Sequence, residues 1–174
     1  QKLCRSALWL KDGRVERFFE TVGEHGCTTV RCVTSAANSG SIAFHEALGF
    51  TVATHENPLP GGGPFLVAQR IESAGLPTAL VYGHGDVVEG MEGEWRDNLD
   101  PWQTTTRGER VYGRGTADNK GQHSINLAAL RAVRETRGGK LGFNAKFIIE
   151  TGEEIGSPDL RQVCEAHREE LKAD

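Results

Sequence analysis

The sequence has few cysteines, one methionine and no long uninterrupted apolar run. Cys4, Cys27, Cys32 and Cys164 are irregularly spaced and form no C-x-x-C pair. This spacing indicates neither a zinc knuckle nor a disulfide framework, and reduced thiols in a cytoplasm fit it best. The apolar run Ala7 to Leu10 is too short for a signal peptide, and no run approaches the length of a membrane span. These absences predict a cytoplasmic protein.

Charge of one sign is not concentrated anywhere in the chain. The net charge is −4, and the 25% of charged residues carry both signs interspersed. Nucleic acids and anionic membranes are recognised by clusters of Lys and Arg, so we expect neither as a partner. Hydrophobic residues make up 37% of the chain, and its 22 glycines bring the apolar share into the globular range. A length of 174 residues then allows one domain of ordinary size or the pieces of two.

The clearest break in composition is the stretch Asn57 to Pro64, which reads NPLPGGGP. Proline and consecutive glycines cannot continue a helix or a strand. We therefore predict a linker at 54–64 that separates a segment at 1–53 from a second unit at 65–174. A surface loop inside one domain is the alternative, because glycine-rich loops are also common within α/β units.

The second unit shows strand and helix patterns in turn, which predicts an α/β fold. We expect strands at 65–71, 78–83 and 143–151, a helix at 124–133, and a last helix that Ser157 caps. The helix at 124–133 is apolar on most of its circumference, so we expect it to be buried against the sheet. Between residues 89 and 110 we expect an ordered loop that is anchored by Trp95 and Trp102.

His84 and Asp86 follow the predicted strand at 78–83 directly. Open α/β sheets bind their ligands beyond the carboxyl ends of the strands. Alternate residues of an extended segment point the same way, so Asp86 can accept one ring N–H of His84 while the other ring nitrogen faces a metal. His84 would then be a ligand and Asp86 its orienting partner. The alternative is an ordinary turn.

Further acidic residues stand at two other predicted element ends. Asp118 precedes the helix at 124–133 within a glycine-rich stretch, where it either points toward His84 or caps the helix. Glu153 and Glu154 follow the strand at 143–151, and two adjacent carboxylates at a buried strand end require a cation or a proton between them. His167 falls on the apolar side of the last helix, where a core or boundary histidine is expected rather than a ligand.

The combination of these residues resembles the co-catalytic zinc peptidase and deacylase family, which includes aminoacylase, acetylornithine deacetylase, carnosinase-type dipeptidases and glutamate carboxypeptidase. The matching text is YGHGDVV, then W and DPW, YGRGTADNKG and ETGEEIGS, in the order and approximate spacing of the family, over about residues 57 to 174. The resemblance implies an α/β/α sandwich and hydrolysis of an amide or peptide bond in a small peptide or an N-acyl amino acid.

Carried over residue by residue, the resemblance implies three metal ligands and two catalytic residues. His84 would bind one zinc ion, Asp118 would bridge two, and Glu154 would bind the second; cobalt is another possible cation. Glu153 would be the general base that deprotonates the attacking water, and Asp86 would orient His84.

The chain departs from this family at its end. Members supply a further acidic ligand, a late histidine and a separate lid and dimerisation domain, and this sequence stops at Asp174 before any of them. Each metal would lose one ligand, and a catalytic zinc normally has three protein ligands. The expectation is an incomplete sandwich without the dimerisation domain that binds zinc weakly and hydrolyses little.

The first 53 residues resemble another family. The text TSAANSGSIAFHEALGF is similar to the carboxyl-terminal part of GNAT acetyltransferases, at Asn38, Ser41, Phe44, Leu48, Gly49 and Phe50. The resemblance implies a partial acetyltransferase-like α/β segment, although the glycine-rich loop that would bind acetyl-CoA is not matched. Two alternatives to a hydrolase therefore stay open: an acetyl-CoA-dependent N-acetyltransferase remnant, and a non-catalytic fragment that a partner completes.

Overall fold

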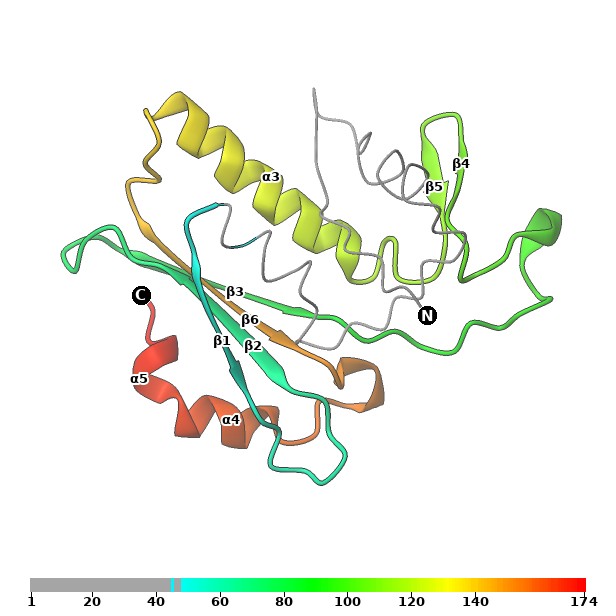
Figure 1. The fold of residues 1–174 in the computed structure, drawn as a ribbon, viewed down its shortest axis with the longest axis horizontal. Helices are drawn as coiled ribbons and strands as arrows, with labels where there is room; N and C mark the ends of the chain where they lie inside the picture. The colour runs from blue at the N-terminus through cyan, green and yellow to red at the C-terminus, as the bar shows by residue number, and fades with distance from the viewer. Residues whose placement is uncertain (1–44, 46–47) are drawn as a thin grey trace.

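The computed structural model describes residue 45 and residues 48–174. A four-stranded sheet has the strand order β1–β2–β6–β3 (Figure 1). β3 and β6 are parallel, whereas β2 is antiparallel to both β1 and β6, so the sheet is mixed. The strands predicted at 65–71, 78–83 and 143–151 are confirmed as β2, β3 and β6 with small shifts at their ends. The observed bounds are Thr51–His55 for β1, Phe65–Arg70 for β2, Thr78–His84 for β3 and Asn144–Glu150 for β6.

Helices cover both faces of this sheet (Figure 1). α3 (Lys120–Thr136) lies on one face, and α4 (Leu160–Ala166) and α5 (Arg168–Leu171) lie on the other. Side chains alternate between the two faces of a strand, so neighbouring residues of β2 serve different layers. Leu66 and Ala68 pack with Leu127 of α3, whereas Phe65 packs with Val163 of α4. The described residues therefore form the α/β/α arrangement that the resemblance implied.

Helix α3 is longer and less buried than the sequence predicted. It begins at Lys120 rather than at 124. Leu127 is buried in the core, but Ile125 on the same helix is 69% exposed. The expectation of a helix buried on most of its circumference was therefore wrong, because α3 packs on the sheet through one side only.

The last helix is divided into two, and Ser157 does not cap it. α4 ends before His167, whose backbone departs from helical geometry, and α5 follows at once. The residue before α4 is Asp159, with a φ of 64° and no side-chain capping bond. The hydroxyl of Ser157 donates instead to Oε1 of Glu150, 2.8 Å away. Glu150 is buried, and a hydrogen bond to a buried carboxylate is worth more than a cap at an exposed helix end.

Short elements between β3 and α3 were not predicted. A one-turn 3₁₀ helix, η1 (Arg96–Asn98), precedes an antiparallel hairpin of β4 (Thr105–Arg107) and β5 (Arg110–Tyr112). Strands of three residues leave too little alternation in the sequence to recognise.

The glycine-rich stretch at 56–64 connects β1 to β2, which pair with each other in one sheet. A loop of this kind is what the alternative of a single domain describes. The division of the chain into 1–53 and 65–174 stays a prediction, because residues 1–44 lie outside the described part. The acetyltransferase-like text falls mostly on those residues as well.

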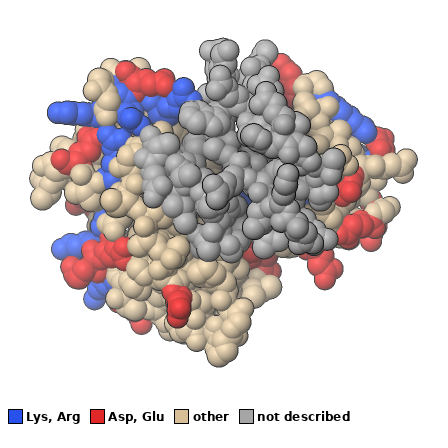
Figure 2. Space-filling view, in the orientation of Figure 1, with Lys and Arg blue, Asp and Glu red and all other residues tan. Residues whose placement is uncertain are grey.

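The described surface carries both charge signs side by side. On the face drawn in Figure 2, Lys and Arg atoms lie near Asp and Glu atoms toward the left and right margins. Within residue 45 and residues 48–174, no helix has the length and apolar character needed to cross a membrane.

Candidate metal centre

His84 is the last residue of β3, and only 4% of it is exposed. The parallel pairing of β3 with β6 places His84 opposite Glu150. The backbone N–H of His84 donates to Oδ1 of Asn119, 3.2 Å away, which links the strand end to the start of α3. The imidazole is thus held at the edge of the sheet where two parallel strands end, the place where α/β sheets bind ligands.

Both ring nitrogens of His84 face acidic residues. Nδ1 lies 3.4 Å from Oδ1 of Asp86 and 3.2 Å from its carbonyl oxygen. Nε2 lies 3.0 Å from Oδ1 of Asp118 and 3.7 Å from Oε2 of Glu153. A neutral imidazole has a single N–H and can donate on one side only. On the other side a lone pair meets carboxylate oxygens, and this contact requires a proton or a cation between them.

Asp86 contacts more than His84. Its Oδ1 accepts the backbone N–H of Glu153 at 3.2 Å, and its Oδ2 accepts that of Glu154 at 3.0 Å. These bonds hold the start of η2 (Glu153–Ile155), the short 3₁₀ helix that follows β6. Asp86 therefore occupies the position expected of an orienting partner and also fixes the loop that carries both glutamates, which the sequence did not predict.

Asp118 lies in the loop before α3, with 67% of its side chain exposed. The alternative role of helix cap is not observed, because the N-cap residue of α3 is Asn119 and no side chain caps the helix. The loop turns tightly at Gly115, whose φ is 76° and where an added Cβ would lie 2.7 Å from Val87. This turn directs the carboxylate of Asp118 toward Nε2 of His84.

Glu153 and Glu154 reach the same place from η2. The side chain of Glu153 is 41% exposed and that of Glu154 is partly buried. One oxygen of each glutamate and one ring nitrogen of His84 lie within 4.8 Å of one another. Three separate loops thus bring together the five residues predicted from the sequence, and their individual roles stay a prediction.

Two residues near this centre were not predicted. The amide of Asn119 holds the backbone of His84, as described above. Glu150, which is 1% exposed, accepts hydrogen bonds from the hydroxyls of Tyr82 and Ser157. Burial raises the pKa of Tyr82, and the neighbouring Glu150 raises it further. For Glu150 the sequence did contain a signal, because this acidic residue stands at the end of an apolar run.

His123 of α3 lies against the end of β3. A Cβ added at Gly83 would come within 2.0 Å of its Cε1 atom, so the two elements pack this closely only because residue 83 is glycine. Burial lowers the pKa of His123 to about 4. The ring is therefore neutral at neutral pH and places no positive charge behind His84.

The loop between β3 and β4 is anchored by its tryptophans, as predicted. The indole N–H of Trp95 donates to the carbonyl of Gly90 at 2.8 Å, and the guanidinium of Arg114 lies 5.4 Å from the Trp95 ring centroid. The indole N–H of Trp102 donates to the carboxylate of Glu92. This hydrogen bond lowers the pKa of Glu92. Both indole rings therefore stabilise the loop itself.

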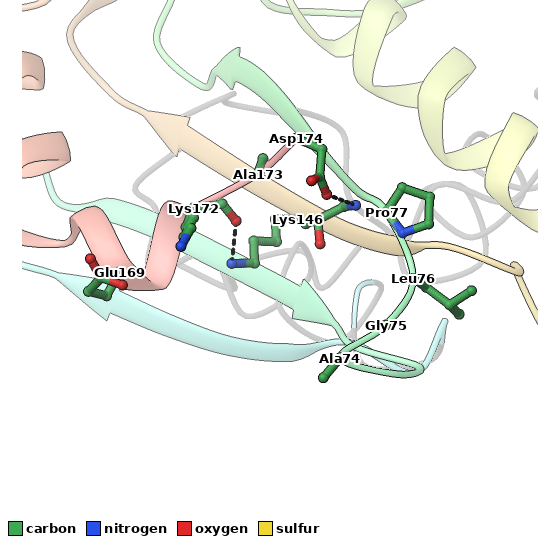
Figure 3. Close-up of a pocket in the computed structure, with 10 residues that line it drawn as sticks. Ala74, Gly75, Leu76, Pro77, Lys146, Glu169, Lys172, Ala173 and Asp174 are labelled. Carbon is green, nitrogen blue, oxygen red and sulfur yellow. Dashed lines mark hydrogen bonds between the residues drawn. The ribbon is translucent and has the colours of Figure 1, made fainter.

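A pocket of about 500 Å³ lies at the opposite end of β3 (Figure 3). Residues 74–78, the buried Lys146 and the chain from Lys172 to Asp174 line it, and Nζ of Lys146 donates to the carbonyl of Lys172 at 2.8 Å. Six residues of strand, or roughly 20 Å, separate its Thr78 end from His84. This pocket is therefore not part of the candidate metal centre.

Comparison with known proteins identifies one family. The model of peptidase family M20/M25/M40 matches residues 80–174. The chain is 36% identical over 130 residues to cysteinylglycine-S-conjugate dipeptidase of Corynebacterium striatum. The aligned region covers 74% of this chain and 28% of the relative. The chain is 41% identical over 80 residues to succinyl-diaminopimelate desuccinylase of Methylobacterium radiotolerans, which covers 46% of this chain and 20% of the relative.

The fold is also similar to that of a solved dipeptidase structure. The crystal structure of human carnosine dipeptidase 1 superposes with a TM-score of 0.65 at 26% sequence identity, covering 97% of this chain and 33% of that chain. The chain thus spans 28% and 20% of the lengths of these two curated relatives and 33% of this solved structure.

Proposed function

The chain belongs to peptidase family M20/M25/M40, and from this premise we propose that it takes part in the hydrolysis of a peptide or amide bond with bound zinc. The family is metal-dependent, and the described residues include a cluster of metal-ligating groups around His84. The observation that carries the proposal is the pairing of both ring nitrogens of His84 with acidic residues. A single N–H cannot serve both sides, and a divalent cation on Nε2 would satisfy this contact, as a second ring proton also would.

The residues present fit zinc. Imidazole nitrogen and carboxylate oxygen are both common zinc ligands, and a ligating histidine commonly donates its other N–H to a carboxylate. His84 and Glu154 of this group would hold the metal together with Asp118, whose Oδ1 lies 3.0 Å from Nε2 of His84. Bound zinc would supply a Lewis acid that polarises the carbonyl of the scissile bond.

Two residues of the chain would orient the ligand and transfer the proton. Asp86 would keep the Nδ1–H tautomer of His84, because its carboxylate and carbonyl both face that nitrogen. Glu153 would act as general base and take the proton of the attacking water, then return it to the leaving amine. Its partial exposure and its 3.7 Å distance from Nε2 of His84 leave it free to approach a water molecule in the centre.

The substrate class follows from the relatives only in outline. The two curated relatives described above are named as a dipeptidase and as a desuccinylase. We propose a small peptide or an N-acyl amino acid as substrate. Cobalt as an alternative metal and a cytoplasmic location stay predictions. No relative or solved structure reported above supports the acetyltransferase alternative.

The proposal is tested by separating metal binding from turnover. Zinc affinity is measured for the chain and for Glu153→Gln, and hydrolysis of a panel of dipeptides and N-acetyl amino acids is measured after both are completed with the remaining ligands and domains of a family member. The glutamine keeps the shape of the side chain and cannot take a proton, so we expect zinc affinity to be retained and turnover to fall by about 100-fold or more. Equal turnover in the two proteins would remove the role of Glu153, and a chain that binds no zinc would reject the proposal itself.

A further inference from the structure

A second group of metal-ligating side chains lies on the face of the sheet that α4 and α5 cover. His55 ends β1, His167 separates α4 from α5, and Glu170 belongs to α5. One potential ligand atom from each lies within 4.8 Å of the other two. Their side chains are 19%, 31% and 24% exposed, respectively, so the group is partly buried and can still be reached from solution.

Two ring nitrogens, one from each histidine, lie beside a single carboxylate oxygen of Glu170. Oε2 of Glu170 lies 2.8 Å from Nε2 of His55 and 3.3 Å from Nδ1 of His167. The two imidazole rings stack with 3.6 Å between their centroids and 28° between their planes. Four-coordinate zinc holds its ligands at ~2 Å, which places neighbouring ligand atoms roughly 3.3 Å apart. The 3.3 Å separation from His167 equals that value, and the 2.8 Å separation from His55 is about 0.5 Å shorter.

The contact between His55 and Glu170 is short but is not a hydrogen bond. Nε2 of His55 is buried and has no hydrogen-bond partner within the described part of the chain, although Oε2 of Glu170 is 2.8 Å away. At this distance the failure lies in direction: the oxygen does not stand where an Nε2–H would point. A buried ring nitrogen that lies beside a carboxylate oxygen without a hydrogen bond to it is free to bind a cation that the oxygen also contacts.

Hydrogen bonds from two strands hold Glu170 in place. Nε2 of Gln69 donates to Oε1 of Glu170 at 3.0 Å, which leaves Oε2 facing the histidines. Nζ of Lys146 donates to the backbone carbonyl of Glu170 at 2.6 Å. Metal sites commonly hold their carboxylate ligands by such outer hydrogen bonds. The group is therefore pre-arranged by β2 and β6 as well as by its own elements.

This group is separate from the centre at His84. β2 and β6 lie between β1, which carries His55, and β3, which carries His84. Three strand spacings separate the two backbones by roughly 14 Å. The two histidines contact different carboxylates, Glu170 for His55 and Asp118 for His84, and no residue belongs to both groups.

We propose that His55, His167 and Glu170 form a second cation site that joins the edge strand β1 to α5. Two imidazoles and one carboxylate suit zinc or a similar first-row transition metal, whereas Mg²⁺ and Ca²⁺ prefer sites made of oxygen. The site ties an edge of the sheet to its helical layer and takes no part in the hydrolysis proposed above.

The test uses the full chain with the first centre removed by His84→Ala and Asp118→Ala. Zinc is titrated alone, its affinity is read by competition with a chromogenic chelator, and the melting temperature is recorded with and without zinc. We expect this double variant to keep one equivalent of zinc and to melt at a higher temperature when zinc is added. Adding Glu170→Gln should lower the affinity by about 100-fold and abolish the zinc-induced rise in melting temperature.

Glu169→Gln is the matched control, because it removes the same charge from the neighbouring position of α5 and lies outside the group. We expect it to leave zinc affinity unchanged, and Gln69→Leu to lower the affinity by about tenfold through the lost hydrogen bond. A double variant that binds no zinc would overturn the proposal. Equal losses with Glu169→Gln and Glu170→Gln would overturn it too, since binding would then reflect only the charge of the helix. Either result would identify the group as an ion pair and leave the centre at His84 untouched.

Discussion

Oδ2 of Asp86 accepts a 3.0 Å hydrogen bond from the backbone N–H of Glu154, and Oδ1 of the same carboxylate lies 3.4 Å from Nδ1 of His84. One side chain therefore positions two candidate ligands that arise from different strands. A loss of Asp86 should disturb both at once, although Asp86 itself touches no metal in the proposed arrangement.

We accordingly expect Asp86→Ala to lower zinc affinity by about 10-fold to 100-fold, the range measured for outer partners of metal ligands. The comparison is Glu89→Ala, which removes an exposed acid three residues along the same segment. Competition with a chelator measures both variants. If the two proteins bind zinc alike, Asp86 is not the residue that organises the centre.

The close approach of the Asp118 loop to α3 gives a second prediction. A Cβ at Gly121 would lie 2.9 Å from the backbone carbonyl oxygen of Thr116, which cannot move without moving the loop. We expect Gly121→Ala to destabilise the fold by about 2 kcal/mol and to weaken zinc binding through Asp118. Gly75→Ala is the control, because an added Cβ there meets no atom within 4 Å. Denaturant unfolding compares the two, and equal stabilities would show that the loop gives way.

The contribution of α3 to the free energy of unfolding should come from one face of the helix only. Leu127 is 7% exposed and Ile125 is 69% exposed on the same helix. Leu127→Ala should lower the free energy of unfolding by about 3 kcal/mol through loss of core packing, whereas Ile125→Ala should change it by less than about 0.5 kcal/mol. Chemical denaturation followed by circular dichroism measures both values. A large effect at Ile125 would mean that this side of the helix is covered.

Acid stability should depend on Glu72. Its carboxylate accepts the backbone N–H groups of Leu141 and Gly142, which together with Arg70 lower its pKa from 4.5 to about 2. A lowered acid pKa stabilises the fold above the unfolded value of 4.5, and this contribution is lost as the pH falls from 4.5 toward 2.

The variant Glu72→Gln should therefore cost about 2 kcal/mol at neutral pH, from hydrogen bonds to a charged group, and flatten the stability profile below pH 4.5. The exposed Glu94→Gln should keep the profile of the parent chain. Urea unfolding at several pH values provides the comparison. A Glu72 variant with an unchanged slope between pH 4.5 and pH 2 would contradict the assignment.

The sequence predicted the parts of this structure that depend on local patterns. β3 and β6 are apolar runs bounded by turn residues, and parallel strands that end together bring His84 and Glu153 to one edge of the sheet. The glycines before Asp118 suggested that it points toward His84, and its Oδ1 lies 3.0 Å from Nε2 of His84. Each of these inferences needed only the residues beside the one in question.

The remaining features depend on contacts between distant parts of the chain. No local pattern relates His55 to His167, whose rings meet because β1 and the α4–α5 junction share one face of the sheet. Ser157 leaves its expected capping role because a buried carboxylate of β6 needs its hydroxyl. Asn119 likewise contacts the backbone of β3 across the fold.

The most direct test of the central claim is a calorimetric zinc titration in the His167→Gln background, where only the centre at His84 should bind. With Asp118 intact we expect saturable zinc binding, and with Asp118→Ala we expect the affinity to fall by about 100-fold or more, because a ligand 3.0 Å from Nε2 of His84 is lost. Identical binding curves with and without Asp118 would contradict the claim that these loops form a metal centre.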